Sequence, residues 1–211
     1  KHFDASFDEV FARLDADGDG VVDPTELRRL MFGDFLIPGA DPKVYGEVLE
    51  YDQLHAVVTE YLTDFNSTSK KPMHLVLFLY ALEHVCRICR IISQPGGHAL
   101  LVGVGGSGRQ SLTRLAAYTA ECDVFSITLT RGYNETLFRE DLKALYGMLS
   151  APVAFFFSDA HVAEEGFLEL VNNMLTSGMV PALYADDEKE VVINGVRDEV
   201  RAAGLGETKE A

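Results

Sequence analysis

The sequence predicts an α/β fold, a parallel sheet with flanking helices, that follows a small all-α unit. Apolar strands alternate with amphipathic helices in the second half of the chain, the order expected for parallel strands with right-handed crossovers. Before residue 34, apolar residues recur at helical spacing on either side of an acidic loop. The 211 residues, 47% of them hydrophobic, suffice for one ordinary domain and a small appendage.

The α/β part is expected to be truncated by one or two strands. Strands are predicted over residues 98–103, 123–129 and 153–157, and helices over residues 109–120, 135–150 and 163–177. Asn134 has the residue type of an N-cap, and Gly178 that of a helix stop. The continuous apolar run at 153–157 predicts a central strand buried on both faces. The charged segment from Asp186 onward is expected to fray.

The preceding part is expected to be helical. Residues 33–50 contain Pro38, Gly39 and Pro42 and predict an irregular connector. Residues 51–65 keep helical apolar spacing, and a longer helix is predicted over residues 72–92.

Residues 15–26 fit the twelve-residue EF-hand calcium loop at every diagnostic position. Ca²⁺ takes six to eight oxygen ligands, and Gly20 stands where the loop turns sharply. A helix is expected on each side, the second with Leu27, Leu30 and Met31 on its apolar face. The alternative is an acidic turn without a metal. The expected calcium ligands are Asp15, Asp17, Asp19, the Val21 carbonyl, Asp23 and Glu26.

A glycine-rich phosphate-binding loop follows the first predicted strand. Gly103, four residues and Gly108 form the start of the P-loop pattern. Backbone N–H groups of such a loop point at phosphate oxygens, and the next helix adds its positive N-terminal end. The expected nucleotide-binding residues are Gly103, Gly105, Gly106, Ser107, Gly108, Arg109, Gln110 and Ser111.

The ending of this loop predicts binding of ATP or ADP without cleavage. Arg109 stands where the P-loop pattern has Lys, and Gln110 stands where it has Ser or Thr. Gln110 has no hydroxyl to bind Mg²⁺. Ser111 has one but lies about 100° further round the helix. After strand 153–157, Asp159 can serve the Mg²⁺ that accompanies the nucleotide. Ala160 stands where P-loop ATPases carry the Glu that polarises the attacking water. We therefore assign no catalytic residue.

The charge balance argues against two classes of partner. With 18 basic and 33 acidic residues, the net charge is −15, which disfavours nucleic acid and an anionic membrane surface. Residues 75–92 are apolar but interrupted by charges, so no membrane span is expected. Three cysteines suggest a reducing compartment, and the Cys86–Cys89 spacing fits a helix core better than a redox or zinc pair.

The sequence around these motifs closely resembles the fourth AAA+ module of dynein heavy chains, the axonemal type in particular. The resemblance covers about residues 29–203 and includes the altered ending Arg109-Gln110-Ser111, itself a mark of this module. The EF-hand segment at 3–31 is not a usual part of this region and looks like an insertion or replacement. The matching stretches are residues 30–35, 71–78, 81–84, 94–97, 99–117, 138–143 and 165–183.

The resemblance implies a fragment of a ring-shaped microtubule motor with six AAA+ modules in one chain. The parent motor would be a microtubule-dependent ATPase, whereas the fourth module is regulatory and this fragment would hydrolyse little or nothing. The implied partners are the other AAA+ modules of the same heavy chain, dynein complex subunits, and microtubules through distant parts of the parent chain. The implied location is the cytoplasm and cytoskeleton, in the axoneme of a cilium or flagellum.

Four segments follow from these expectations: an EF-hand unit at 1–33, a helical connector at 34–95, an incomplete P-loop AAA+ core at 96–205 and a disordered tail at 206–211. The expected ligands are ATP or ADP, Mg²⁺ and Ca²⁺. One alternative is a calcium-regulated binding protein in which the P-loop fold is a relic. A complete small NTPase is a further alternative, which the missing Glu at position 160 disfavours.

Overall fold

The computed structural model describes residues 2–15, 17–202 and 204. The chain divides into two compact units, the first made of Lys1–Val124 with Pro152–Ala154 and the second of Phe125–Ala151 with Phe155–Ala211. The segment boundaries expected from the sequence differ from this division, and they stay predictions. The tail expected at 206–211 lies outside the described residues.

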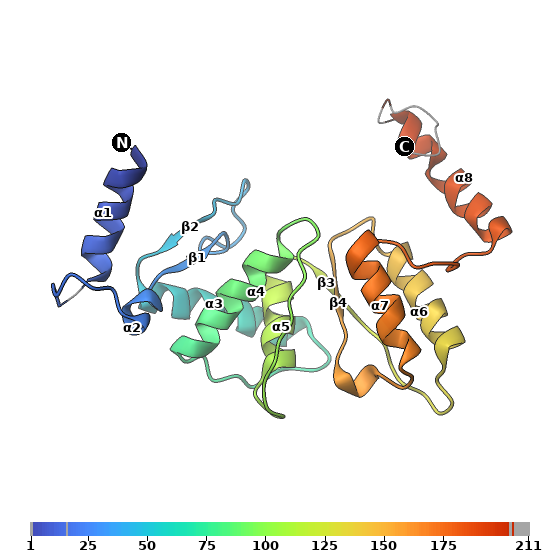
Figure 1. The fold of residues 1–211 in the computed structure, drawn as a ribbon, viewed down its shortest axis with the longest axis horizontal. Helices are drawn as coiled ribbons and strands as arrows, with labels where there is room; N and C mark the ends of the chain where they lie inside the picture. The colour runs from blue at the N-terminus through green and yellow to red at the C-terminus, as the bar shows by residue number, and fades with distance from the viewer. Residues whose placement is uncertain (1, 16, 203, 205–211) are drawn as a thin grey trace. The chain divides into compact units, whose positions relative to one another are not determined.

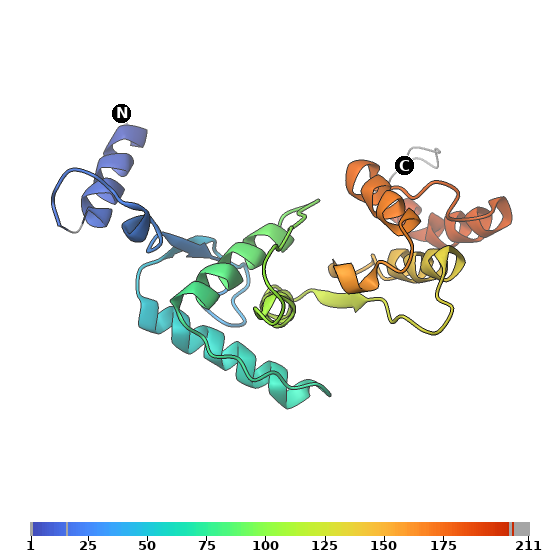
Figure 2. The ribbon, with the colours of Figure 1, turned by 60° about the horizontal axis from the view of Figure 1, so that its bottom comes forward.

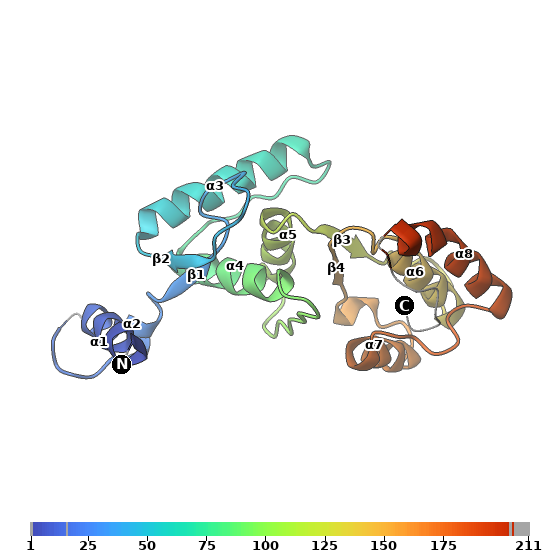
Figure 3. The ribbon, with the colours of Figure 1, turned by 90° about the horizontal axis from the view of Figure 1, so that it is seen from above.

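Three helices form the centre of the first unit. Helix α4 packs against α3, α5 and strand β1 (Figures 1 and 3), and Figure 2 shows α3 as one uninterrupted helix. Leu54, Leu82 and Leu115, one from each helix, are fully buried in the shared core. The elements are α1 (His2–Leu14), α2 (Pro24–Leu27), β1 (Met31–Gly33), β2 (Gly46–Val48), α3 (Tyr51–Thr68), α4 (Leu79–Ile92) and α5 (Arg109–Thr119).

A short antiparallel hairpin replaces part of the connector expected at 33–50. Strand β1 pairs with β2 in the register Met31 to Val48 and Gly33 to Gly46. A Cβ atom at Gly33 would lie 2.7 Å from the ring of Phe35, which is buried, so this close approach requires glycine. The connector prediction was wrong here because two three-residue strands are too short to show a period-2 pattern.

The long helix predicted over 72–92 begins only at Leu79. Before it, side chains alternate between buried Met73 and Leu77 and exposed Val76 and Phe78, the pattern of extended chain. The Asn66 amide fixes this conformation, since it donates to the Met73 carbonyl (2.8 Å) and accepts from the Met73 N–H (2.7 Å). The helix prediction was therefore wrong for its first two turns.

The first strand of the predicted sheet, residues 98–103, is not formed. Among the described residues no strand pairs with this segment, whose alternate side chains Leu100, Val102 and Val104 are 79–90% exposed. Leu101 alone packs against the core of the first unit. A strand exists only when a neighbour supplies hydrogen bonds, so an apolar sequence at this position does not suffice.

Cys86 and Cys89 are free thiols buried in α4, in agreement with their interpretation as core residues. Burial raises the pKa of Cys86 to about 12, and the Cys89 thiol donates to the Ala116 carbonyl at 3.5 Å.

Among the residues that the structure describes, no helix combines the length and apolarity needed to cross a membrane.

A two-stranded sheet confirms the predicted α/β class in a reduced form. Strand β3 (Asp123–Ser126) pairs with β4 (Val153–Phe156), and helix α6 (Glu135–Gly147) connects them. The boundary between the units passes through both strands. The prediction of a strand buried on both faces was wrong, because every residue of β4 is only half-buried. Burial of a central strand needs helices on both faces of a wider sheet.

Aromatic rings form the centre of the second unit. Phe138 of α6 stacks on Phe167 of α7 (Gly166–Ser177), with ring centroids 4.4 Å apart, and both rings are fully buried. Figure 1 shows these two helices side by side. Asn134 caps α6 by accepting from the Leu137 N–H at 3.1 Å, and Gly178 ends α7 at φ +71°, as predicted.

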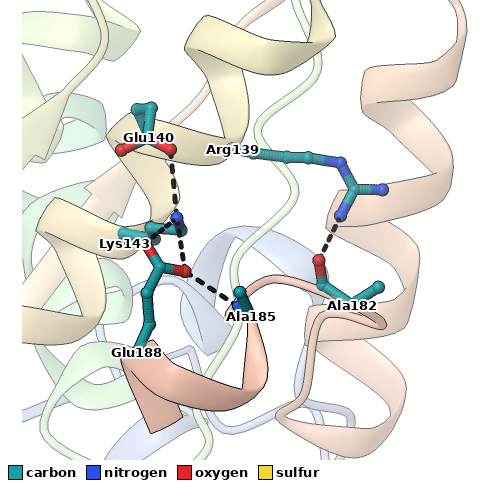
Figure 4. Close-up of polar contacts among 6 residues, drawn as sticks. All are labelled: Arg139, Glu140, Lys143, Ala182, Ala185 and Glu188. Atoms are coloured by element: carbon teal, nitrogen blue, oxygen red, sulfur yellow. Dashed lines mark hydrogen bonds and ion pairs between the residues drawn. The ribbon is translucent and has the colours of Figure 1, made fainter. Parts of the chain in front are cut away.

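Residues 186–202 form helix α8 (Asp186–Ala202) rather than a frayed segment. Its first turn is held by Glu188, which accepts from the Lys143 ammonium (2.7 and 2.9 Å) and the Ala185 N–H (2.8 Å), as Figure 4 shows. The Lys143 hydrogen bond, followed by that of Ala185, lowers the pKa of Glu188. Arg139 donates to the nearby Pro181 and Ala182 carbonyls. The prediction considered only local charge and missed these contacts with α6.

Candidate functional site

The loop after α1 is organised by a single carboxylate. Asp15 follows the last residue of α1 and accepts from the N–H groups of Gly18 (2.9 Å), Asp19 (3.1 Å) and Gly20 (3.0 Å). Gly20 has φ +81°, a left-handed conformation that glycine adopts without strain. Arg13, in the last turn of α1, forms an ion pair with Glu47 of β2 at 2.6 Å and ties this helix to the hairpin.

Three acidic side chains converge in this loop. Carboxylate oxygens of Asp15, Asp17 and Asp19 all lie within 4.8 Å of one another. Asp17 and Asp19 are exposed, and Asp15 is half-buried. Oxygen ligands so placed suit a hard divalent cation, because a cation offsets their mutual repulsion. The residues present therefore fit Ca²⁺ at the first three ligand positions of the predicted loop.

Asp23 and Glu26 stand apart from this group as the capping box of α2. Asp23 accepts from the N–H groups of Thr25 (2.7 Å) and Glu26 (2.9 Å), while Glu26 accepts from the Asp23 N–H at 3.0 Å. Val21 donates its N–H to Asp19 at 2.7 Å. The structure thus brings three of the six predicted ligands together, and assigns Asp23 and Glu26 to the start of the next helix.

The helix predicted after the loop is a single turn. Helix α2 ends at Leu27, whose side chain is 51% exposed, and Met31 lies in β1 with its side chain in the core. The expected apolar helical face of Leu27, Leu30 and Met31 was therefore wrong. Pairing of β1 with β2 takes Met31 out of helical conformation and gives it a buried position that a continued helix would not provide.

The phosphate loop runs directly into α5. Ser107 donates its N–H to the Val104 carbonyl at 3.3 Å, and Gly108, at φ +76°, is the N-cap residue of α5. Gly105, Gly106 and Ser107 are exposed. Packing of α5 against α3 and α4 therefore fixes the helix N-terminus beside the loop, where its positive end favours an anion.

Arg109 braces the loop in this structure. Its guanidinium donates to the carbonyls of Leu101 (3.3 Å) and Val104 (3.2 Å). Gln110 is exposed and Ser111 is half-buried. The sequence predicted only a phosphate contact for Arg109, and no signal in it indicated the carbonyl contacts, because the strand expected over residues 98–103 would have used the Leu101 carbonyl for pairing.

Asp159 belongs to the second unit, in the short helix η1 (Asp159–His161) that follows β4. The Ser158 N–H donates to the His161 ring nitrogen Nδ1 at 3.1 Å, which closes the turn. Burial lowers the pKa of His161, and the neighbouring Asp159 charge opposes this shift. The Asp159 carboxylate is exposed, and Ala160 offers no group that can activate water.

Comparison with known families matches both regions. The family described as the P-loop containing dynein motor region D4 matches residues 73–211, which include the phosphate loop and Asp159. The family described as EF hand matches residues 7–31, which include the acidic loop.

Similar proteins extend this match over most of the chain. Dynein axonemal heavy chain 10 of Homo sapiens is 52% identical over 187 residues, 86% of this chain. The Dynein-1-alpha heavy chain of the flagellar inner arm I1 complex of Chlamydomonas reinhardtii is 56% identical over 173 residues, 81% of this chain. The chain belongs to the family of the P-loop containing dynein motor region D4. It spans about 4% of the length of these two relatives.

The two family matches indicate in general terms which ligand each loop binds. P-loop regions bind nucleotide with Mg²⁺, and EF-hands bind Ca²⁺. The mouse protein Dynein axonemal heavy chain 1 is 40% identical over 207 residues, 96% of this dynein chain, so its likeness reaches beyond the motor region into the N-terminal segment.

Proposed function

We propose that this chain is a regulatory AAA+ module of an axonemal dynein heavy chain that holds nucleotide without cleaving it. ATP or ADP binds over residues 103–108, with backbone N–H groups and Arg109 on the phosphates and Asp159 near the accompanying Mg²⁺. The observation that carries this proposal is a complete glycine loop combined with Gln110 and Ala160, because both chemical groups expected for metal-assisted hydrolysis are replaced.

The test is single-turnover cleavage of ATP by the purified chain with Mg²⁺. General-base positions contribute about 10²–10⁴-fold in rate, so cleavage should stay at the uncatalysed background. Asp159→Ala serves as the control for any residual rate. A rate well above background that Asp159→Ala abolishes would overturn the proposal, because it would require a functional metal and a base that we have not assigned.

The second part of the proposal is one Ca²⁺ at the EF-hand, bound by Asp15, Asp17, Asp19, the Val21 carbonyl, Asp23 and Glu26. Convergence of the first three carboxylates supports it. We expect a Kd on the order of 10⁻⁶ to 10⁻⁴ M. Calorimetry on the chain and on Glu26→Gln tests the assignment, with Glu9→Gln on the exposed face of α1 as the matched control. No calcium binding at millimolar Ca²⁺ would overturn it.

The partners proposed for the chain follow from its family. They are the other AAA+ modules of the same heavy chain, subunits of the dynein complex, and microtubules through distant parts of the motor. The proposed location is the cytoskeleton of the axoneme in a cilium or flagellum, within the cytoplasm. Neither nucleic acid nor a membrane is proposed as a partner, because the net charge of −15 opposes binding to polyanions. We also propose that the first three segments of the chain end at residues 33, 95 and 205.

One observation favours a second candidate, a calcium-regulated binding protein with a relic P-loop. The Arg109 guanidinium already lies on the Leu101 and Val104 carbonyls, so the loop is braced by its own side chain. Titration of ATP and ADP with and without Ca²⁺ separates the candidates. Nucleotide binding at either calcium level supports the first, and calcium binding without any nucleotide binding supports the second.

A further inference from the structure

A cavity of about 180 Å³ lies in the first unit, away from both loops discussed above. One wall is helix α4, which contributes Glu83, Cys86, Arg87 and Arg90. These positions follow i, i+3, i+4 and i+7 spacing and therefore share one helical face. The other wall is formed by Arg28 and residues 30–32, the segment that leads from α2 into β1.

Glu83 is the unusual member of this cavity. Its side chain is buried, with 3% of the residue exposed, and its Oε1 atom has no hydrogen-bond partner. Burial removes the water that hydrates this carboxylate oxygen, and without a hydrogen-bond donor the cost of desolvation is not offset. Since Glu83 lines the cavity, a molecule inside the cavity can supply the missing donor.

Three arginine residues, all of them exposed, contribute to the lining of the same cavity. Arg28, Arg87 and Arg90 line the cavity, and within residues 2–15, 17–202 and 204 none of them forms an ion pair. Arg28 lies 5.9 Å from the centre of the Tyr80 ring, which holds it over α4. The positive charges of Arg90 and Arg87 oppose the burial that raises the pKa of Cys86. The cavity is therefore net positive, with one acceptor that needs a proton donor.

We propose that this cavity binds inorganic phosphate. The ligand must accept hydrogen bonds from guanidinium groups and donate one to the Glu83 carboxylate. Phosphate at neutral pH does both, because it is anionic and keeps at least one hydroxyl. Sulfate has no proton to donate, and a phosphomonoester with a second pKa near 6 has mostly lost its own at pH 7. The cavity volume of about 180 Å³ leaves room for one tetrahedral oxyanion.

The test is a titration of the ¹⁵N-labelled chain with phosphate, sulfate or phosphoserine at pH 7 and constant ionic strength, followed by NMR. Amides of residues 83–90 and 30–32 report this cavity, and amides of 103–108 report the phosphate loop separately. We expect phosphate to bind the cavity about tenfold more tightly than sulfate, the effect of one charge-assisted hydrogen bond. Phosphoserine should bind more weakly than phosphate. Equal binding of phosphate and phosphoserine would overturn the assignment to free phosphate.

Variants distinguish this site from a general attraction of anions. Glu83→Gln replaces the acceptor with a carboxamide that can donate to either anion, so the preference for phosphate over sulfate should fall to about twofold or less. Arg87→Ala and Arg90→Ala should weaken both anions about tenfold. Arg29→Ala is the matched control, because Arg29 is exposed beside Arg28 but does not line the cavity.

Two results would overturn the proposal. One is equal binding of phosphate and sulfate by the unmodified chain. The other is no response of the amides at 83–90 to millimolar phosphate, which would mean that the orphan oxygen of Glu83 is satisfied by rearrangement of Arg87, one helical turn away.

Discussion

The calcium loop and the phosphate loop are both short, glycine-rich segments, but they are held in different ways. Asp15 organises the calcium loop through hydrogen bonds to the next few residues, and three carboxylates converge there. The phosphate loop has one backbone turn and the Arg109 contacts, and the segment before it pairs with no described strand. A motif built from local hydrogen bonds carries its own conformation, whereas a motif that ends a strand depends on the neighbours of that strand.

The largest effect should come from replacing Asp15, the residue that organises the calcium loop. Asp15→Ala deletes a predicted calcium ligand and the acceptor of three backbone N–H groups. We expect the Kd for Ca²⁺ to rise by about 100-fold or more, since loss of even an outer-shell partner costs about 10–100-fold. Calorimetry measures this, and Asp8→Ala on the exposed face of α1 is the control. A change below threefold would mean that the loop is not organised by Asp15.

The corresponding change in the phosphate loop is Arg109→Ala. It removes the proposed phosphate contact and the brace on the Leu101 and Val104 carbonyls, so ADP affinity should fall by about tenfold. Ser111→Ala, two residues further along α5, should change it by less than about threefold. Fluorescence titration with a labelled ADP compares them. Equal losses for the two variants would show that the charge contact is assigned to the wrong residue.

Two glycines, one in each loop, should respond differently to substitution because their surroundings differ. Gly20 has φ +81°, so Gly20→Ala forces a side chain into the left-handed region at about 1–2 kcal/mol and should weaken calcium binding about five- to thirtyfold. At Gly103 an added Cβ would meet Ser107 Oγ at 3.4 Å and Arg109 Cδ at 3.6 Å, both on flexible side chains. Gly103→Ala should therefore leave the free energy of unfolding within about 0.5 kcal/mol. Calorimetry and urea unfolding test the pair.

The smallest effect concerns a surface contact between distant residues, the ion pair of Glu188 with Lys143. Because this contact lowers the pKa of Glu188, its contribution is present above the ordinary carboxyl pKa of about 4.3 and is lost as the pH falls through the lowered value. The protection factors of the first-turn amides of α8, which are exchange rates relative to those of the unfolded chain at the same pH, should fall on acidification more in the unmodified chain than in Glu188→Gln. Glu190→Gln, exposed on the same helix, should behave like the unmodified chain.

The sequence predicted those elements whose signals are local. Helix α5 and the ends of α6 and α7 follow from apolar spacing, the Asn134 cap and the Gly178 stop. It did not predict the extended segment 72–78, because the two hydrogen bonds between Asn66 and Met73 connect the residue after one predicted helix with the start of the next. It also missed the β1–β2 hairpin and the docking of α8, which depend on partners 13 or more residues away.

The same limit applies to the candidate site. Spacing alone placed Asp15, Asp17 and Asp19 on one loop, and the structure brings their oxygens together. Spacing could not show that Asp23 and Glu26 form a capping box, because an EF-hand and a helix N-terminus require the same residue types at these positions. The ligand roles of all six residues, and of the phosphate loop, stay predictions.

The segment at 98–104 has a practical consequence for work with this chain in solution. It forms no strand, and Leu100, Val102 and Val104 present exposed apolar side chains. An unpaired edge of this kind is a template for β-pairing between molecules, so the purified chain should self-associate as its concentration rises. A lysine at Val102 would act as a gatekeeper, since a charge at an exposed edge opposes intermolecular pairing without disturbing the buried Leu101 contact.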